Sequence, residues 1–342
     1  MTLRTTSTST SAAVILALTS LVVGGHDADA ALTTRCVGEA GAVTVPGDLV
    51  VPAGRSCVLR GTVIQGEARV QAGADLLLRD GASISGDLRV MPDGFVDVVG
   101  STIGGRLVGR GLYGARLDGG TVGGAVTVRP DDAFDGVPFV VTSGAVLDGD
   151  VDARTGQVIL ESTTVTGDVT TRGAELTDIA DSTIVGSVTV RENRSGAAVC
   201  ASEIYGNAVY RQNGYGLQLG GNGPLRPCRG ATFWGGDLTI DGNAAPDAGI
   251  DVSESIVAGR LRGSGNAPTP TGAGNRVRGG SAGQFRDLQP AGRLQVQPQQ
   301  QRTMAATSTP AGRRGDADER LVARVETAEA AAHAAGPAEL AP

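Results

Sequence analysis

A glycine recurs along most of this chain at intervals of about 18 to 20 residues, with a few longer gaps. In one copy, Gly86 has Ile84 two positions before it and Leu88 two positions after it, and the other copies repeat this apolar pattern with a single exception at Ser281. Self-similarity at such a period is typical of solenoids, in which each repeat forms one turn. The glycines that define the repeat are Gly47, Gly66, Gly86, Gly105, Gly124, Gly149, Gly167, Gly186, Gly206, Gly236, Gly259 and Gly279.

The residues around each glycine alternate between apolar and polar, which indicates a short strand with one buried face. A second apolar run follows about ten residues later, for example at Leu76–Leu78. A single turn of this length cannot bury its own apolar face, whereas stacked turns bury it between them. The sequence therefore predicts an all-β fold, a right-handed parallel β-helix (β-solenoid) of about 12 turns with 18–20 residues per turn, over residues 31–288 including an N-terminal cap.

Four cysteines provide a test of this arrangement. Cys36 and Cys57 are separated by about one turn, and Cys200 and Cys228 by about one turn plus an insertion. Equivalent positions in neighbouring turns lie about 4.8 Å apart, within the Cα separation of about 4.4–6.8 Å that a disulfide spans. We therefore predict the disulfides Cys36–Cys57 and Cys200–Cys228, which favour an oxidising compartment.

Both ends depart from the repeat. Residues 1–30 have the layout of a secretory signal peptide, with an apolar run followed by the cleavage motif Ala28-Asp29-Ala30, and the alternative is an N-terminal membrane anchor. No later segment is apolar enough to span a membrane, so we expect a protein that is secreted to the extracellular space or the cell envelope. Residues 289–342 form a low-complexity tail, in which residues 317–335 have a helix-forming composition but few large apolar side chains and predict a marginal helix.

The charge balance and the histidine positions exclude several classes of function. The net charge is -7, and arginine carries all of the fixed positive side-chain charge because the chain has no lysine. This balance argues against a nucleic-acid partner, which requires a concentrated basic surface. The two histidines, His26 and His333, lie in the predicted signal peptide and in the tail. The solenoid therefore lacks the residues for a histidine-based triad or zinc site, and we expect no cofactor and no metal.

One copy of the repeat is rich in carboxylates. On a strand with alternating faces, Asp148, Asp150 and Asp152 share the outward side, and Asp168 stacks one turn later. Clustered carboxylates can bind Ca²⁺ or act as an acid–base pair on a sugar, and these four residues are the candidates for catalysis. The alternative is a solvated acidic face without a ligand, which is the usual fate of exposed charges.

Half of the aromatic residues lie within a short segment around the longest insertion. Flat aromatic surfaces beside polar groups suit sugar rings or protein partners, so this segment is the predicted binding face. The alternative is that these side chains only pack the long loop. The candidate binding residues are Tyr205, Tyr210, Arg211, Tyr215, Phe233 and Trp234.

A Gly-Asp-Leu or Gly-Asp-Val signature recurs within the repeat and resembles the repeat of the bactofilin family. The resemblance implies a compact right-handed β-helix that polymerises end to end into filaments without a nucleotide. It is best over residues 45–190, while the predicted signal peptide, disulfides and insertions depart from the family pattern and favour an exported, capped solenoid. The signature stands at Gly47-Asp48-Leu49, Gly86-Asp87-Leu88, Gly149-Asp150-Val151, Gly167-Asp168-Val169 and Gly236-Asp237-Leu238.

These features favour a secreted, non-enzymatic β-solenoid that acts as a structural, cell-envelope or adhesive binding module. Its expected partners are a glycan or another cell-envelope component, with self-association as a further option. The alternative from another class is a polysaccharide lyase or glycoside hydrolase that uses the acidic residues, although a fold alone does not imply activity. A third option is ice or crystal-surface binding through the outward column Thr102, Thr121, Thr164 and Thr183, which is interrupted at Val146.

Overall fold

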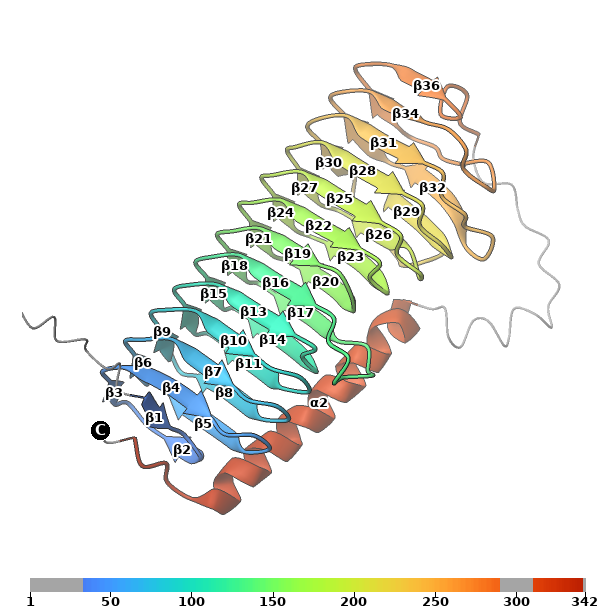
Figure 1. Cartoon of the computed structure of the whole chain (residues 1–342). Coiled ribbons are helices and arrows are strands. Elements are labelled where there is room, and N and C mark those ends of the chain that lie inside the picture. Colours follow the sequence, from blue (N-terminus) through green and yellow to red (C-terminus); the bar gives the residue numbers. More distant parts are fainter. Residues whose placement is uncertain (1–32, 290–309, 341–342) are drawn as a thin grey trace, which may run out of the picture. The chain divides into compact units, whose positions relative to one another are not determined.

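The computed structural model describes residues 33–289 and 310–340, which form a parallel β-solenoid of about 13 turns and a long helix (Figure 1). The predicted all-β solenoid is therefore confirmed, with one more turn than expected, because a strand at Thr33–Arg35 precedes the first glycine of the repeat and pairs with the turn that follows. The predicted signal peptide and residues 290–309 of the predicted tail lie outside the described residues.

Each turn contributes to three parallel sheets, which we call A, B and C. Sheet A follows the glycine of the repeat, and its strands direct apolar side chains such as Leu88 and Leu107 into the core, one above the other. Its strands are β1 (Thr33–Arg35), β4 (Asp48–Val51), β7 (Ala68–Val70), β10 (Leu88–Val90), β13 (Leu107–Arg110), β16 (Val126–Arg129), β19 (Val151–Ala153), β22 (Val169–Arg172), β25 (Val188–Arg191), β28 (Ala208–Arg211), β31 (Leu238–Asp241), β34 (Leu261–Gly263) and β36 (Ser281–Gly283).

Sheet B corresponds to the second apolar run of each turn. Its strands bury side chains on both faces, as Leu76 and Leu78 point into the core while Leu77 between them is buried on the outer face. Its strands are β2 (Gly38–Ala40), β5 (Ser56–Arg60), β8 (Asp75–Arg79), β11 (Phe95–Val99), β14 (Gly114–Asp118), β17 (Phe139–Ser143), β20 (Gln157–Glu161), β23 (Leu176–Ala180), β26 (Ala197–Cys200), β29 (Gly216–Gly220) and β32 (Gly249–Ser253).

Sheet C consists of short strands that immediately precede the glycine. Ile84, Ile103 and Val122 are paired in register and buried, so the stacked neighbours that the repeat predicts are present. Its strands are β3 (Thr44–Val45), β6 (Val63–Ile64), β9 (Ser83–Ile84), β12 (Thr102–Ile103), β15 (Thr121–Val122), β18 (Val146–Leu147), β21 (Thr164–Val165), β24 (Thr183–Ile184), β27 (Glu203–Ile204), β30 (Thr232–Trp234), β33 (Ser255–Val257) and β35 (Arg276–Val277).

The repeated glycine stands at the corner between sheets C and A. There the backbones of successive turns approach so closely that a Cβ on Gly105 would lie 2.6 Å from the carbonyl carbon of Gly86. A side chain at this position would force the turns apart, because real Cβ atoms do not come so near to another backbone. The period of the sequence therefore records one close contact in each turn.

Helix α2 (Pro310–Ala335) lies along the outer face of sheet B (Figure 1). It begins seven positions before the predicted 317–335 helix, and its buried positions are mostly alanines, which let the helix approach the sheet. Ala317 and Leu321 pack on Phe139 and its neighbours, and Ala328 and Ala332 pack on Val58 and Leu77. The composition alone predicted a marginal helix. It could not account for packing against the sheet, and tertiary packing provides most of a helix's stability in proteins.

Two arginines fasten this helix to the sheet. Arg324 Nε donates to Asp75 Oδ1 at 2.6 Å, and its guanidinium stands 4.8 Å from the centre of the Tyr113 ring. The guanidinium of Arg320 stands 5.2 Å from the centre of the Phe139 ring. Burial raises the pKa of Asp75, although the hydrogen bond and the charge of Arg324 act in the opposite direction.

The segment after the helix closes the first turns of the solenoid. The backbone N–H of Glu39 donates to the carbonyl of Gly336 at 3.0 Å, and the N–H of Ala338 donates to the carbonyl of Glu39 at 2.7 Å. Residues 336–338 thus pair with β2 at the edge of sheet B, and Leu340 is buried against the solenoid core. Among the described residues, no helix combines the length and apolarity that spanning a bilayer requires.

Candidate functional site

The acidic candidates occupy two sheets rather than one face. Asp148 follows β18 of sheet C, Asp152 lies in β19 of sheet A, and Asp150 stands at the corner between them. The prediction that these three side chains share one outward side is therefore wrong, because the chain turns a corner at Gly149. Within residues 33–289 and 310–340, no three His, Cys, Asp or Glu side chains come together in a way that could hold a metal ion.

Two of these carboxylates are bound to the backbone of the next turn. Asp150 Oδ1 accepts a hydrogen bond from the N–H of Asp168 at 2.8 Å, and Asp168 Oδ1 accepts one from the N–H of Ser187 at 2.7 Å. Each side chain satisfies a backbone donor at the corner, where the strand ladder is interrupted. This contact gives Asp150 and Asp168 a structural role in place of the predicted catalytic one.

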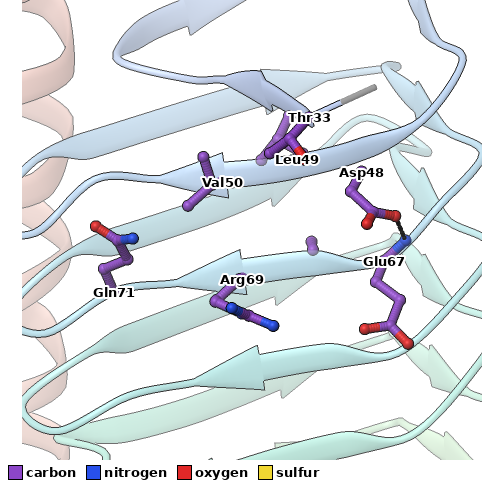
Figure 2. A pocket seen from close by; sticks show the side chains of 8 residues that line it. Thr33, Asp48, Leu49, Val50, Glu67, Arg69 and Gln71 are labelled. Carbon is purple, nitrogen blue, oxygen red and sulfur yellow. Dashed lines mark hydrogen bonds between the residues drawn. The ribbon is translucent and has the colours of Figure 1, made fainter. Parts of the chain in front are cut away.

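The same contact explains the whole Gly-Asp signature. Figure 2 shows one example, in which Asp48 accepts from the N–H of Glu67 at 2.8 Å beside a depression of about 270 Å³ on the outer face of sheet A. We call this column of side chains the corner ladder. Its further rungs join Asp87 to the N–H of Arg106 at 2.8 Å, Ser187 to Asn207 at 3.2 Å, Asn207 to Asp237 at 2.9 Å and Asp237 to Arg260 at 2.9 Å.

The remaining two acidic candidates do not join a site either. Asp152 forms an ion pair with Arg129 on sheet A. Asp148 is exposed, and its backbone carbonyl accepts a hydrogen bond from the hydroxyl of Thr166 at 2.6 Å. Five surface depressions in the described part of the chain have volumes of about 260–410 Å³, and none of these five is lined by Asp148, Asp150, Asp152 or Asp168.

Two of the aromatic candidates belong to the core. Tyr210 and Trp234 are 0% exposed, and their rings meet edge to face with centroids 6.2 Å apart. Tyr210 stacks between Val190 and Ile240, so it takes an inward position that aliphatic residues occupy in the neighbouring turns. The prediction that Tyr210 and Trp234 form a contact face is therefore wrong, because strand alternation turns both side chains inward.

Tyr205 and Phe233 remain on the surface as an aromatic pair on the outer face of sheet C. Their ring centroids are 5.8 Å apart, and Tyr205 is 51% exposed. The Tyr205 hydroxyl donates to Glu203 Oε2 at 2.7 Å, and this hydrogen bond raises the pKa of the tyrosine. Val185, in the adjacent turn, is equally exposed. These residues form a small apolar surface suitable for a sugar ring.

The other two binding candidates lie elsewhere. Arg211 is on sheet A and donates to Asp241 Oδ2 at 3.1 Å. Tyr215 is partly buried in the bend before β29 and has a positive φ of 57°. The six candidates are therefore divided among the core, sheet C, sheet A and a bend, and they do not form one site.

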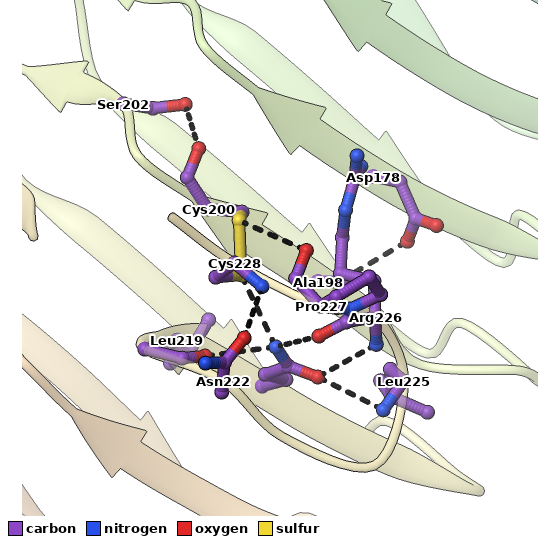
Figure 3. Close-up of a disulfide and its surroundings, with 12 residues drawn as sticks. Asp178, Ala198, Cys200, Ser202, Leu219, Asn222, Leu225, Arg226, Pro227 and Cys228 are labelled. Carbon is purple, nitrogen blue, oxygen red and sulfur yellow. Dashed lines mark hydrogen bonds between the residues drawn. A yellow bond between two sulfur atoms is a disulfide. The ribbon is translucent and has the colours of Figure 1, made fainter. Parts of the chain in front are cut away.

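Both predicted disulfides are present, with Cα separations of 5.7 Å for Cys36–Cys57 and 5.5 Å for Cys200–Cys228. The second disulfide attaches the insertion at residues 221–229 to the outer face of sheet B (Figure 3). The buried side chain of Gln218 also holds this loop. Its Oε1 accepts from the N–H groups of Leu225 and Arg226 at 2.8 and 2.9 Å, and its Nε2 donates to the carbonyl of Gly221 at 2.8 Å.

Glu161 lies where the insertion and helix α2 meet. It pairs with Arg226 of the insertion at 3.5 Å and with Arg314 of the helix. Burial acts to raise the pKa of this carboxyl, but the hydrogen bonds and charges of Arg314 and Arg226 outweigh it and lower the pKa. The chain's own segments therefore cover the outer face of sheet B from β2 to β29, while sheets A and C keep exposed outer faces.

A ladder of buried asparagines, which was not predicted from the sequence, lies inside the later turns. Asn243 Oδ1 accepts from both the backbone N–H and the Nδ2 of Asn213, each at 2.9 Å, and Asn243 Nδ2 donates to Asn266 Oδ1 at 2.9 Å. The signal was the spacing, because Asn193, Asn213, Asn243 and Asn266 each stand seven positions after the glycine of their turn. A buried amide column satisfies backbone groups inside the solenoid, as the corner ladder does at its surface.

A column of arginines on sheet A was also overlooked. These side chains stand five positions after the corner glycine in six successive turns, so the same period would have found them.

Comparison of the chain with protein-family models, with curated proteins and with solved structures found no match.

Proposed function

We propose that this protein is an exported, non-enzymatic β-solenoid that serves as a structural or adhesive binding module of the cell envelope. The observation that carries the proposal is that three of the four acidic candidates already have structural partners within the solenoid. Asp150 and Asp168 each accept a backbone hydrogen bond from the next turn, and Asp152 is paired with Arg129. These contacts account for the carboxylates without a catalytic role, and they favour a rigid scaffold over a polysaccharide lyase or hydrolase.

Export is supported by the two disulfides, which persist in oxidising compartments. The layout of residues 1–30 is that of a secretory signal peptide. A glycan of the cell envelope is the partner that the exposed surface favours, because the Tyr205–Phe233 pair, with its rings packed edge to face, offers exposed aromatic surface on an open sheet face.

The likeness of the Gly-Asp repeat to that of bactofilins adds self-association to this proposal. In the described residues, the edge of sheet B at β2 is paired with residues 336–338 and Leu340 is buried against the core beside it. The opposite end of sheet A, at β36, has no further strand paired to it within the described part of the chain. Of the two ends, the β36 end is therefore the less covered in the described residues, and we place self-association there.

Retention of the purified protein on insoluble cell-envelope glycans tests the binding role. We expect the Tyr205→Ala/Phe233→Ala variant to be retained at least about 10-fold less than the wild type, because it removes the aromatic platform. Val146→Ala provides the control, since Val146 is also exposed on sheet C but lies several turns away. Equal retention of all three proteins would refute the aromatic face.

A second assay addresses the enzymatic alternative. The wild type and Asp150→Asn are incubated with uronic-acid polysaccharides, and new reducing or unsaturated ends are measured. We expect neither protein to release products. Products that appear with the wild type and not with Asp150→Asn would overturn the non-enzymatic proposal.

A further inference from the structure

Six arginines form one column parallel to the solenoid axis, at the C-terminal ends of successive strands of sheet A, and we call them the arginine column. The strand register pairs Arg110 with Arg129, and Arg191 with both Arg172 and Arg211. The pairing of β19 with its two neighbours places Arg154 in the gap between Arg129 and Arg172. The column is therefore continuous, with one guanidinium per turn, and consists of Arg110, Arg129, Arg154, Arg172, Arg191 and Arg211.

Like charges directly opposite each other on neighbouring strands destabilise a sheet, so this column needs compensating anions. Four of its members have an internal carboxylate, and two do not. The internal pairs are Arg110–Asp131 at 3.4 Å, Arg129–Asp152, Arg172–Glu192 at 3.2 Å and Arg211–Asp241 at 3.1 Å.

Arg154 and Arg191 have no carboxylate within 4.0 Å among the described residues. Arg154 is exposed, whereas Arg191 is partly buried and its Nε is fully buried without any hydrogen-bond acceptor. A buried, charged donor that lacks an acceptor is costly. The buried Nε of Arg191 is out of reach of a ligand, but the guanidinium charges of Arg154 and Arg191, which no carboxylate of the described residues balances, favour an anion that contacts the column at two points with one turn between them.

The surface beside the column offers hydroxyl groups. In the adjacent outward column of sheet A, Thr127, Thr170 and Thr189 stand half-exposed on successive or nearby turns, with Asp152 among them. Threonine hydroxyls both donate and accept hydrogen bonds, as sugar hydroxyls require. A ligand that lies along the solenoid axis would therefore meet guanidinium groups on one side and hydroxyl groups on the other.

We infer that the arginine column binds a linear acidic polysaccharide whose carboxylates contact Arg154 and Arg191. An extended polyuronate carries one carboxylate per sugar ring, so it presents charges at a regular repeat along its length, as the stacked turns do. Arginine binds carboxylates through two parallel hydrogen bonds. The inference rests on the proposed binding role and names the class of glycan.

The internal carboxylates argue for a polyuronate over a nucleic acid. Asp131, Asp152, Glu192 and Asp241 lie beside the arginines with which they pair and would repel a densely charged phosphate backbone. Nucleic-acid binding depends on neutralising many phosphates at once. A polyuronate, with a single charge on each ring, can place its carboxylates at the two uncompensated arginines and its hydroxyls between them.

A fluorescently labelled oligogalacturonate, long enough to span the six turns, tests this inference by titration with the purified full chain. We expect Arg154→Gln/Arg191→Gln to bind at least about 10-fold more weakly than the wild type. The matched control is Arg69→Gln/Arg260→Gln, which removes the same charge from two exposed arginines outside the column, one on sheet A and one at the corner before β34, and it should lose less than about 2-fold. Binding to the wild type should also weaken as salt is added.

Three outcomes would overturn the inference: no binding to the wild type, equal losses in both variants, or a column-dependent affinity for single-stranded DNA that matches the affinity for the oligogalacturonate. The result is separable from the proposed function. If the wild type is retained on envelope glycans through Tyr205 and Phe233 while the column variant binds the oligogalacturonate normally, the binding module stands and the arginine column is not its polyuronate site.

Discussion

Replacing Asn243 by alanine tests whether burial decides the value of an inter-turn hydrogen bond. Asn243 Oδ1 accepts from the backbone N–H and the Nδ2 of Asn213, and its Nδ2 donates to the carbonyl of Tyr210 at 3.1 Å. The substitution leaves the buried N–H of Asn213 without this acceptor and the carbonyl of Tyr210 without this donor. Asn213 Nδ2 retains its second bond, to the carbonyl of Val190 at 3.1 Å.

The magnitude follows from these two groups. A buried polar group that loses its partner costs about 1–3 kcal/mol, so Asn243→Ala should lower the free energy of unfolding by about 2–6 kcal/mol. Asp150→Ala removes the analogous bond of the corner ladder, to the N–H of Asp168, but both residues are exposed. Water replaces the lost acceptor there, so the expected cost is about 1 kcal/mol or less.

Urea-induced unfolding, followed by the fluorescence of the single tryptophan Trp234, measures both variants. Ile240→Val controls for simple loss of packing near Asn243, and we expect it to cost about 1 kcal/mol. If Asp150→Ala destabilises the protein as much as Asn243→Ala, or if Asn243→Ala costs no more than Ile240→Val, the argument from burial is refuted.

Three further predictions concern the covered surfaces. Removal of residues 336–342 should increase the mass measured by light scattering relative to the full chain, because it exposes the edge of β2; an unchanged mass would show that this edge needs no cover. Cys200→Ser/Cys228→Ser should lower stability by at most about 3 kcal/mol and should open residues 221–229 to limited proteolysis, whereas unaltered cleavage would assign the fixing of the loop to Gln218. The pKa of Glu161 is lowered in the folded state, so its stabilising contribution is complete above the ordinary carboxyl pKa and is lost as the pH falls through the folded value. Glu161→Gln should therefore flatten the acid side of a plot of thermal midpoint against pH, and an identical slope in both proteins would contradict this assignment.

The repeat could be predicted because it reflects a contact that every turn makes. Ile84, Ile103 and Val122 stack as their spacing indicated, and Cys36 and Cys57 meet because neighbouring turns bring equivalent positions together. A period of this kind determines which residues are adjacent along the axis. It does not determine where the corners lie within the turn, and Asp148 and Asp152 were therefore assigned to one face although a corner separates them.

The aromatic face illustrates the second limit. Clustering in the sequence indicated that Tyr205, Tyr210 and Trp234 act together, yet strand alternation directs Tyr210 and Trp234 inward and leaves Tyr205 outside. The repeat register that predicted the aliphatic core also predicts that Tyr210 and Trp234 point inward. The docking of helix α2 was harder to predict from the sequence, because its buried positions are mostly alanines. The stability that a buried alanine contributes depends on how closely the opposing surface approaches it.

The return of the chain to its own beginning has a consequence for how the molecule is made. Glu39 acquires its partners Gly336 and Ala338 only after the ribosome has added nearly all of the intervening polypeptide. A nascent chain can form its first turns, but the edge strand β2 stays unpaired until residues 336–338 have been synthesised. Pairing of β2 with residues 336–338 thus distinguishes full-length molecules from truncated ones, and a truncated product would carry an unpaired, aggregation-prone edge strand near its N-terminus.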